Sequence, residues 1–102
     1  MPQYLVIAHD AKDDAGGKRR LAARPEHLQA IRPLIESGAI VCASAVLDDA
    51  GNVVGSALKM DMPSRAALDA WIAQEPFQRH GVWERVEVMP IRISIREGKL
   101  LT

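Results

Sequence analysis

The sequence has only one cysteine and no excess of charge of either sign, and each of these facts excludes some kinds of protein. With Cys42 alone, the chain can form no internal disulfide and no metal site that needs two cysteines. Lys and Arg total 13, as do Asp and Glu, so the formal net charge is zero. Nucleic-acid binders usually carry a basic excess, because phosphate neutralisation supplies much of their affinity. We therefore expect no nucleic-acid partner.

Long apolar runs are also missing. No segment approaches the roughly 20 consecutive apolar residues that a membrane-spanning helix needs. The first residues, Met1 to Tyr4, lack the basic start and apolar stretch of a signal peptide. We therefore expect a cytoplasmic protein that does not associate with membranes. Cys42 lies in the apolar run from Ile40 to Ala43, which predicts a buried thiol that acts as a small hydrophobic residue.

Length and composition indicate a single domain over residues 1–102. Apolar residues make up 48% of the chain and charged residues 25%, the ordinary range for globular proteins. A domain of about 100 residues buries only about two thirds of the surface that its unfolded chain exposes. An association surface would therefore add considerably to its stability.

The hydrophobic pattern predicts four strands and two helices in the order βαββαβ. The strands are expected at residues 4–8, 38–47, 53–60 and 82–95, and the helices at 18–37 and 64–74. Pro25 suits a first helical turn better than an interior, so the first helix should begin, restart or kink at Arg24. Pro90 marks an edge strand or a bulge. Residues 11–18 are expected to be a mobile loop and 96–102 a loose tail.

This order is the split β-α-β arrangement of ferredoxin-like α+β domains, with an antiparallel sheet and both helices on one face. The strand at 38–47 has apolar or small residues at both alternating sets of positions. A strand with one wet face should alternate more clearly. We therefore expect a partner sheet to cover the second face, which is most simply supplied by a homodimer.

Two residues could form an acid–base pair. His27 lies at the edge of the apolar stripe of the first helix, so it is either a half-buried structural residue or a proton-transfer group facing a pocket. Glu75 follows the second helix, and the two helices of this fold lie side by side, so its carboxylate could approach the imidazole. It could equally be a surface glutamate that precedes a proline.

Other chemistry has little support in the sequence. The three histidines lack metal-binding spacing, and no phosphate loop, dinucleotide fingerprint or nucleophile elbow is present, so no metal and no cofactor are expected. His9 and His80 are expected to be exposed. Ser44 either lines a polar pocket or bonds to a neighbouring carbonyl. The sequence also has a local cluster of arginines, which comprises Arg19, Arg20, Arg24 and Arg32. This cluster is either a solvated helix face or a positively charged surface that attracts an anionic small molecule.

Several motifs, taken in order, resemble the YciI-like proteins. The first is the helical stretch with Arg20, Arg24, Pro25, His27 and Leu28. The others are Gly38–Ile40, Gly55, Glu75–Phe77, Gly81–Val82 and Val86–Pro90. The matching positions extend over nearly the whole chain. The family usually has aspartate where this sequence has Glu75, which is one methylene longer.

The resemblance implies a dimeric α+β barrel of ferredoxin-like protomers and a site built around His27 and Glu75. Relatives of this fold include a class that eliminates chloride from a chlorinated hydroxyquinol, monooxygenases and haem enzymes. The resulting hypothesis is a metal-independent lyase or hydrolase with His27 as acid/base and Glu75 as its orienting partner. Its binding residues would be Arg20, Arg24, Ser44 and Phe77. The alternative is a non-catalytic ligand-binding or stress-associated module, and a haem-dependent protein is a third reading.

Overall fold

The computed structural model describes residues 1–14 and 17–101. Its main elements are β1 (Gln3–Asp10), α1 (Lys18–Ser37), β2 (Ile40–Leu47), β3 (Val53–Asp61), α2 (Arg65–Gln74) and β4 (Trp83–Ile91). They confirm the predicted order βαββαβ. The short helix α3 (Pro76–Arg79) and the strands β5 (Ile95–Arg96) and β6 (Lys99–Leu100) complete the described elements. Residues 15 and 16 of the predicted mobile loop lie outside the described residues.

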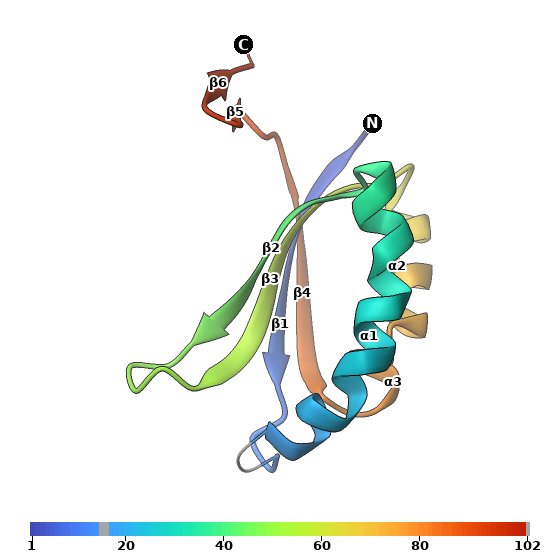
Figure 1. The fold of residues 1–102 in the computed structure, drawn as a ribbon. Helices are drawn as coiled ribbons and strands as arrows, with labels where there is room; N and C mark the ends of the chain where they lie inside the picture. Colours follow the sequence, from blue (N-terminus) through green and yellow to red (C-terminus); the bar gives the residue numbers. More distant parts are fainter. Residues whose placement is uncertain (15–16, 102) are drawn as a thin grey trace.

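The four long strands form one antiparallel sheet in the order β2-β3-β1-β4. All three helices lie on the same side of this sheet, and the other side carries none (Figure 1). In β1, Tyr4, Val6 and Ala8 are buried while the intervening residues are partly exposed. This alternation identifies the covered face, because successive side chains of a strand point to opposite faces.

The main core lies between the covered face and the helices. Val6 of β1, Met60 of β3 and Leu68 of α2 are fully buried there. Burial of one such side chain typically contributes about 1.5–3 kcal/mol. A second buried cluster, at the end of the sheet near α3, contains Phe77 and Trp83. The candidate site is built on this second cluster.

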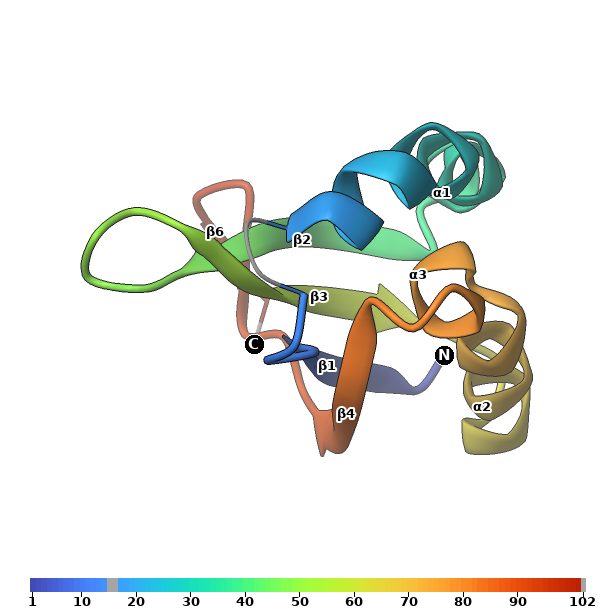
Figure 2. The same ribbon diagram turned by 90° about the horizontal axis from the view of Figure 1, so that it is seen from below.

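Helix α1 begins at Lys18 and continues through Pro25. Because Pro25 has no N–H, it removes the bond to the carbonyl of Leu21, which favours a bend. The first turns of α1 run in a different direction from the rest of the helix (Figure 2). This agrees with the predicted kink. The helix ends at Ser37 and is capped by Gly38, whose φ is 82° and whose N–H donates to the Ile35 carbonyl over 3.1 Å.

Two further residues, Ser64 and Gly55, are suited to the backbone geometry at their positions. Ser64 caps α2, as predicted, by accepting from the Ala67 N–H over 3.1 Å. Gly55 of β3 passes so close to β1 that an added Cβ would lie 2.4 Å from the Ala8 carbonyl oxygen. Only glycine fits there without a backbone shift.

Three expectations from the sequence are wrong. Cys42 is exposed rather than buried, because β2 is an edge strand and the pairing of Cys42 with Lys59 puts it on the bare face of the sheet. The last long strand ends at Ile91 rather than at residue 95. The tail is not simply loose, since β5 and β6 pair as a small hairpin beyond the sheet (Figure 1).

Pro90 lies opposite Tyr4 in β4, which is the other edge strand of the sheet. Proline has no N–H to donate to a neighbouring strand, so it is confined to such edge positions.

Within the described part of the chain, no helix is both long and apolar enough to span a bilayer. Nor do three or more His, Cys, Asp or Glu side chains among the described residues gather in a group that could hold a metal ion.

Candidate functional site

His27 and Glu75 are in contact. The Nδ1 atom of His27 is hydrogen-bonded to Oε1 of Glu75, and the second carboxylate oxygen accepts from the Phe77 N–H over 2.6 Å. Glu75 follows α2 and caps the N-terminus of α3, so both helices fix its position. Its side chain is 0% exposed and that of His27 only 13%. The longer glutamate therefore reaches the histidine while also capping α3.

This bonding pattern determines which nitrogen of His27 is available. When Glu75 is ionised, its carboxylate can only accept hydrogen bonds, and Nδ1 of His27 then carries the proton between the two groups. In the neutral imidazole, Nε2 is then the unprotonated nitrogen. The pair can thus present a proton acceptor at a fixed position, the arrangement that general acid–base chemistry needs.

Phe77 is the centre of an aromatic group beside this pair. The His27 ring stacks on it with centroids 3.9 Å apart and planes 10° apart. Trp83 meets the same ring edge-on at 5.9 Å and 69°. The guanidinium carbon of Arg20 lies 4.6 Å from the Phe77 centroid, a cation–π contact. These contacts hold the imidazole in one plane.

Arg20 is held by three hydrogen bonds. Its Nε and Nη2 donate to the two carboxylate oxygens of Asp10 over 2.7 and 2.9 Å, and Nη2 also donates to Ser56 Oγ over 2.9 Å. Because this bidentate pair is only 11–14% exposed, much of the arginine charge is already compensated. Nη1 keeps two donors that these three bonds do not use.

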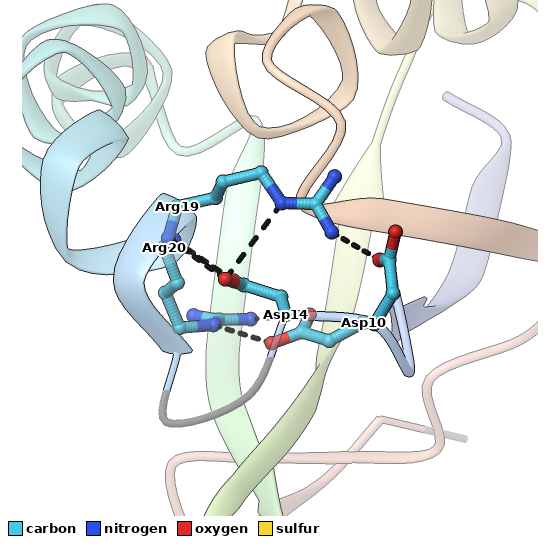
Figure 3. Close-up of polar contacts among 5 residues, drawn as sticks. Asp10, Asp14, Arg19 and Arg20 are labelled. Atoms are coloured by element: carbon cyan, nitrogen blue, oxygen red, sulfur yellow. Dashed lines mark hydrogen bonds and ion pairs between the residues drawn. The ribbon is translucent and has the colours of Figure 1, made fainter.

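A second carboxylate anchors the same turn of α1. Asp14 accepts from the Arg19 N–H over 3.0 Å and thereby caps a helix whose N-cap residue, Gly17, offers no side chain. This backbone bond is the main reason that the pKa of Asp14 lies below its usual range. Figure 3 shows Asp10 and Asp14 together with Arg19 and Arg20 at the start of α1.

A cleft of about 190 Å³ opens beside His27, between α1, β2, β3 and the second buried cluster. Its lining includes five of the six predicted site residues, and Glu75 lies behind His27. The lining residues are Arg20, Arg24, His27, Leu28, Ile31, Ala43, Ser44, Ala45, Ser56, Leu58, Phe77 and Trp83. Arg24 is exposed and makes no ion pair or hydrogen bond with any residue that the structure describes.

Ser44 borders the cleft, but its side chain belongs to the other face of the sheet. It pairs with Ala57, which pairs with Ile7, and these positions alternate with the buried ones. The serine whose side chain faces the site is Ser56, which receives a hydrogen bond from Arg20. A larger hollow of about 690 Å³ lies next to the cleft, between the segment after β1 and the β2–β3 hairpin, and shares only Arg20 with it.

The sequence reasoning missed Asp10, Ser56 and Trp83. Strand alternation could have indicated Ser56, since it lies two residues from buried Leu58 and so shares its face. Asp10 and Arg20 are only ten residues apart, at the end of β1 and in the first turn of α1. His80 is exposed, as predicted, and the side chain of His9 is 40% exposed and bonds to Glu87.

The fold belongs to a known structural class. A dehydrochlorinase for 5-chloro-2-hydroxyhydroquinone from Burkholderia phenoliruptrix, solved with 2,5-dihydroxybenzoquinone, superposes with a TM-score of 0.76 at 21% identity. The match covers 88% of this chain and 93% of that one. An antibiotic biosynthesis monooxygenase superposes with a TM-score of 0.51 at 14% identity, covering 91% and 98% of the two chains. The chain therefore has the fold of the dimeric α+β barrel proteins.

The family follows from the sequence itself. The model of the YCII-related domain matches residues 2–92, so this chain belongs to the YCII-related family. No curated protein matches the sequence.

Proposed function

We propose that this protein is a small-molecule enzyme of the lyase or hydrolase type, with His27 as acid/base and Glu75 as its orienting partner. The observation that carries the proposal is the hydrogen bond between Nδ1 of His27, which lines the cleft, and the completely buried carboxylate of Glu75 behind it. A positioned acid or base of this kind typically contributes about 10²–10⁴-fold in rate.

The cleft suits a small, partly apolar anion. Leu28, Ile31 and Leu58 supply apolar lining, while Arg20 and Arg24 supply positive charge. Within this set Arg24 is the cation that would attract the anion, because Asp10 already compensates Arg20. Arg20 would instead keep Phe77 and His27 in position and offer its free Nη1 edge.

A homodimer is part of the proposal. From Cys42 to Leu47, β2 is exposed, and the bare face of the sheet also carries Leu5, Ile7 and Met89, which are partly or largely exposed. A second copy of the sheet would remove this apolar surface from water. Sedimentation velocity at micromolar concentration should return a dimer, and a well-folded monomer would contradict this part of the proposal.

The enzyme proposal can be tested with the compounds of the dehydrochlorinase. We expect chloride release from 5-chloro-2-hydroxyhydroquinone above the uncatalysed rate, with one proton and one chloride leaving the substrate. His27→Asn should reduce this rate by about 10²–10⁴-fold. Glu26→Gln, which changes an exposed neighbour of His27, is the control and should leave the rate unchanged.

Two outcomes would contradict the proposal. Release that is insensitive to His27→Asn would exclude the histidine as acid/base. Tight binding of 2,5-dihydroxybenzoquinone without any chloride release would instead favour the non-catalytic ligand-binding module.

A further inference from the structure

Ser56, in β3, has a hydroxyl group whose own proton is not used. Its Oγ atom accepts a hydrogen bond from Arg20 Nη2 over 2.9 Å. A guanidinium group can only donate, so this bond engages an oxygen lone pair and leaves the serine proton free. Within the described residues, Ser56 Oγ makes no other hydrogen bond. The hydroxyl is therefore held by its acceptor side and is ready to donate.

The side chain of Ser56 points to the helix side of the sheet, where the cleft lies. It pairs with Ala8, which is fully buried on that side, and with Ala45 of β2. Directly paired residues of neighbouring strands point to the same face. Ser56 is partly exposed and lines the cleft, and its neighbours Ala43 and Ala45 in the lining are exposed. These small side chains leave the hydroxyl within reach of a ligand.

Arg20 supplies a second donor beside this hydroxyl. Its Nε and Nη2 atoms bond to Asp10, and Nη2 also bonds to Ser56. The remaining nitrogen, Nη1, takes no part in these bonds, and it is not one of the buried unpaired atoms of the described residues. Nη1 is therefore accessible. The bidentate bond to Asp10 fixes the guanidinium plane and leaves Nη1 as its open edge.

The same cleft also offers a proton acceptor. When Glu75 is ionised, this acceptor is the Nε2 atom of the neutral His27 ring. A carboxylate ligand would satisfy the two donors but would place a second acceptor against Nε2. A ligand with an acidic hydrogen on an oxygen, or on the carbon beside a carbonyl group, matches the donors and the acceptor together.

We propose that Ser56 is a further substrate-binding residue, whose O–H donates together with Arg20 Nη1 to a ligand oxygen that becomes negatively charged. The ligand class is a small phenol or an enolisable carbonyl compound. Its acidic hydrogen goes to Nε2 of His27, and the electron pair of the broken O–H or C–H bond stays on the ligand as a phenolate or enolate. Donors placed where negative charge develops stabilise such an anion. The inference rests on the proposed function, because it uses the same cleft and the same histidine.

Two probes of matched shape, 4-nitrophenol and its methyl ether 4-nitroanisole, test this inference. The phenol can lose a hydrogen, and its phenolate absorbs at a longer wavelength, whereas the ether has no acidic hydrogen. Calorimetry at neutral pH should show that the phenol binds about tenfold more tightly than the ether, or better. The absorption spectrum should show a larger phenolate fraction in the bound probe than in the free probe.

Ser56→Ala removes the hydroxyl and leaves both bonds between Arg20 and Asp10 in place. This change should weaken binding of 4-nitrophenol about tenfold, the effect of losing a hydrogen bond to a charged oxygen. It should also lower the bound phenolate fraction, while binding of 4-nitroanisole and the melting temperature change little. Ser56→Thr keeps the hydroxyl and should keep the wild-type affinity and spectrum.

Ser44→Ala is the matched control, because Ser44 borders the same cleft but its side chain lies on the other face of the sheet. It should leave the binding of both probes unchanged. Equal effects of Ser44→Ala and Ser56→Ala would contradict the inference. Equal weakening of both probes by Ser56→Ala, or a loss in Ser56→Thr as large as in Ser56→Ala, would show that Ser56 has only a structural role.

The outcome for Ser56 is separable from that for the enzyme proposal. If chloride release requires His27 but 4-nitrophenol binds equally well to Ser56→Ala and to the wild type, the inference is wrong and the acid–base proposal stands. If Ser56→Ala weakens only the phenol and chloride release is absent, Ser56 is a binding residue and the enzyme proposal fails. No detectable binding of 4-nitrophenol to the wild type would contradict the inference as well.

Discussion

Two histidine–glutamate pairs join α1 to the segment that contains α3, and they differ in burial. In the first, His27 and Glu75 have side chains that are 13% and 0% exposed. In the second, His80 Nε2 lies 3.1 Å from Glu26 Oε1, and the side chains are 46% and 48% exposed. Glu26 and His27 are adjacent in the sequence, so the same turn of α1 supplies one member of each pair.

The difference between the pairs shows what burial adds to identical chemistry. Water can replace either partner of the exposed pair, which also includes Arg79, so its loss should matter little. No water is available to Glu75, and each partner that is removed leaves a polar group unpaired. Only the buried pair can therefore fix the position of a proton.

The largest effect is expected for Glu75→Ala. This change removes the acceptor of both the His27 Nδ1–H and the Phe77 N–H, and with it the cap of α3. The free energy of unfolding should fall by about 3 kcal/mol, or the melting temperature by roughly 4–8 °C per kcal/mol in a domain of this size. Urea unfolding followed by circular dichroism, at matched protein concentrations, measures this loss.

Glu26→Ala is the matched control for that measurement. Its unfolding midpoint should coincide with that of the wild type within error, because the pair that it breaks is exposed. Equal losses for the two alanine variants would mean that burial does not distinguish the pairs.

A smaller effect on stability, but a specific one on protonation, is expected for Glu75→Gln. The Phe77 N–H can only donate, so it keeps the amide oxygen and turns the NH₂ group toward His27. Nδ1 must then accept, and the neutral imidazole should change to the tautomer with the proton on Nε2. Long-range ¹H–¹⁵N spectra report this change, while stability should fall by no more than about 1 kcal/mol. An unchanged tautomer would refute the proposed role of Glu75.

The sequence predicted the order of the elements because periodicity and caps are local signals. The kink near Arg24, the cap at Ser64 and the edge position of Pro90 all follow from single residues and their neighbours. The β5–β6 hairpin was missed because its strands have two residues each and carry no periodicity.

Contacts between distant residues were harder to predict. His27 and Glu75 are 48 positions apart, and their pairing was expected only from the order of the helices and the resemblance to a family. The burial of Cys42 was predicted wrongly because hydrophobicity does not show which strand forms an edge. The bond from Arg20 to Ser56 spans 36 positions and depends on how α1 packs against the sheet.

The smallest effect concerns the pKa of Glu26. The hydrogen bond from His80, and then that from Arg79, hold the pKa of this carboxyl below its ordinary value of 4.5. A folded-state pKa that is lowered gives stability that is present above the unfolded-state pKa and is lost as the pH falls through the folded-state pKa. The stabilising contribution of this carboxyl is therefore intact at neutral pH and declines only below about pH 4.5.

A ¹³C titration of the Glu26 carboxyl should give a midpoint below that of free glutamate, and His80→Asn should raise this midpoint. Because both side chains are about half exposed, the urea midpoint of His80→Asn should match that of the wild type at pH 7. A midpoint at or above that of free glutamate would show that this pair does not form, and the contrast in burial would then lack its exposed member.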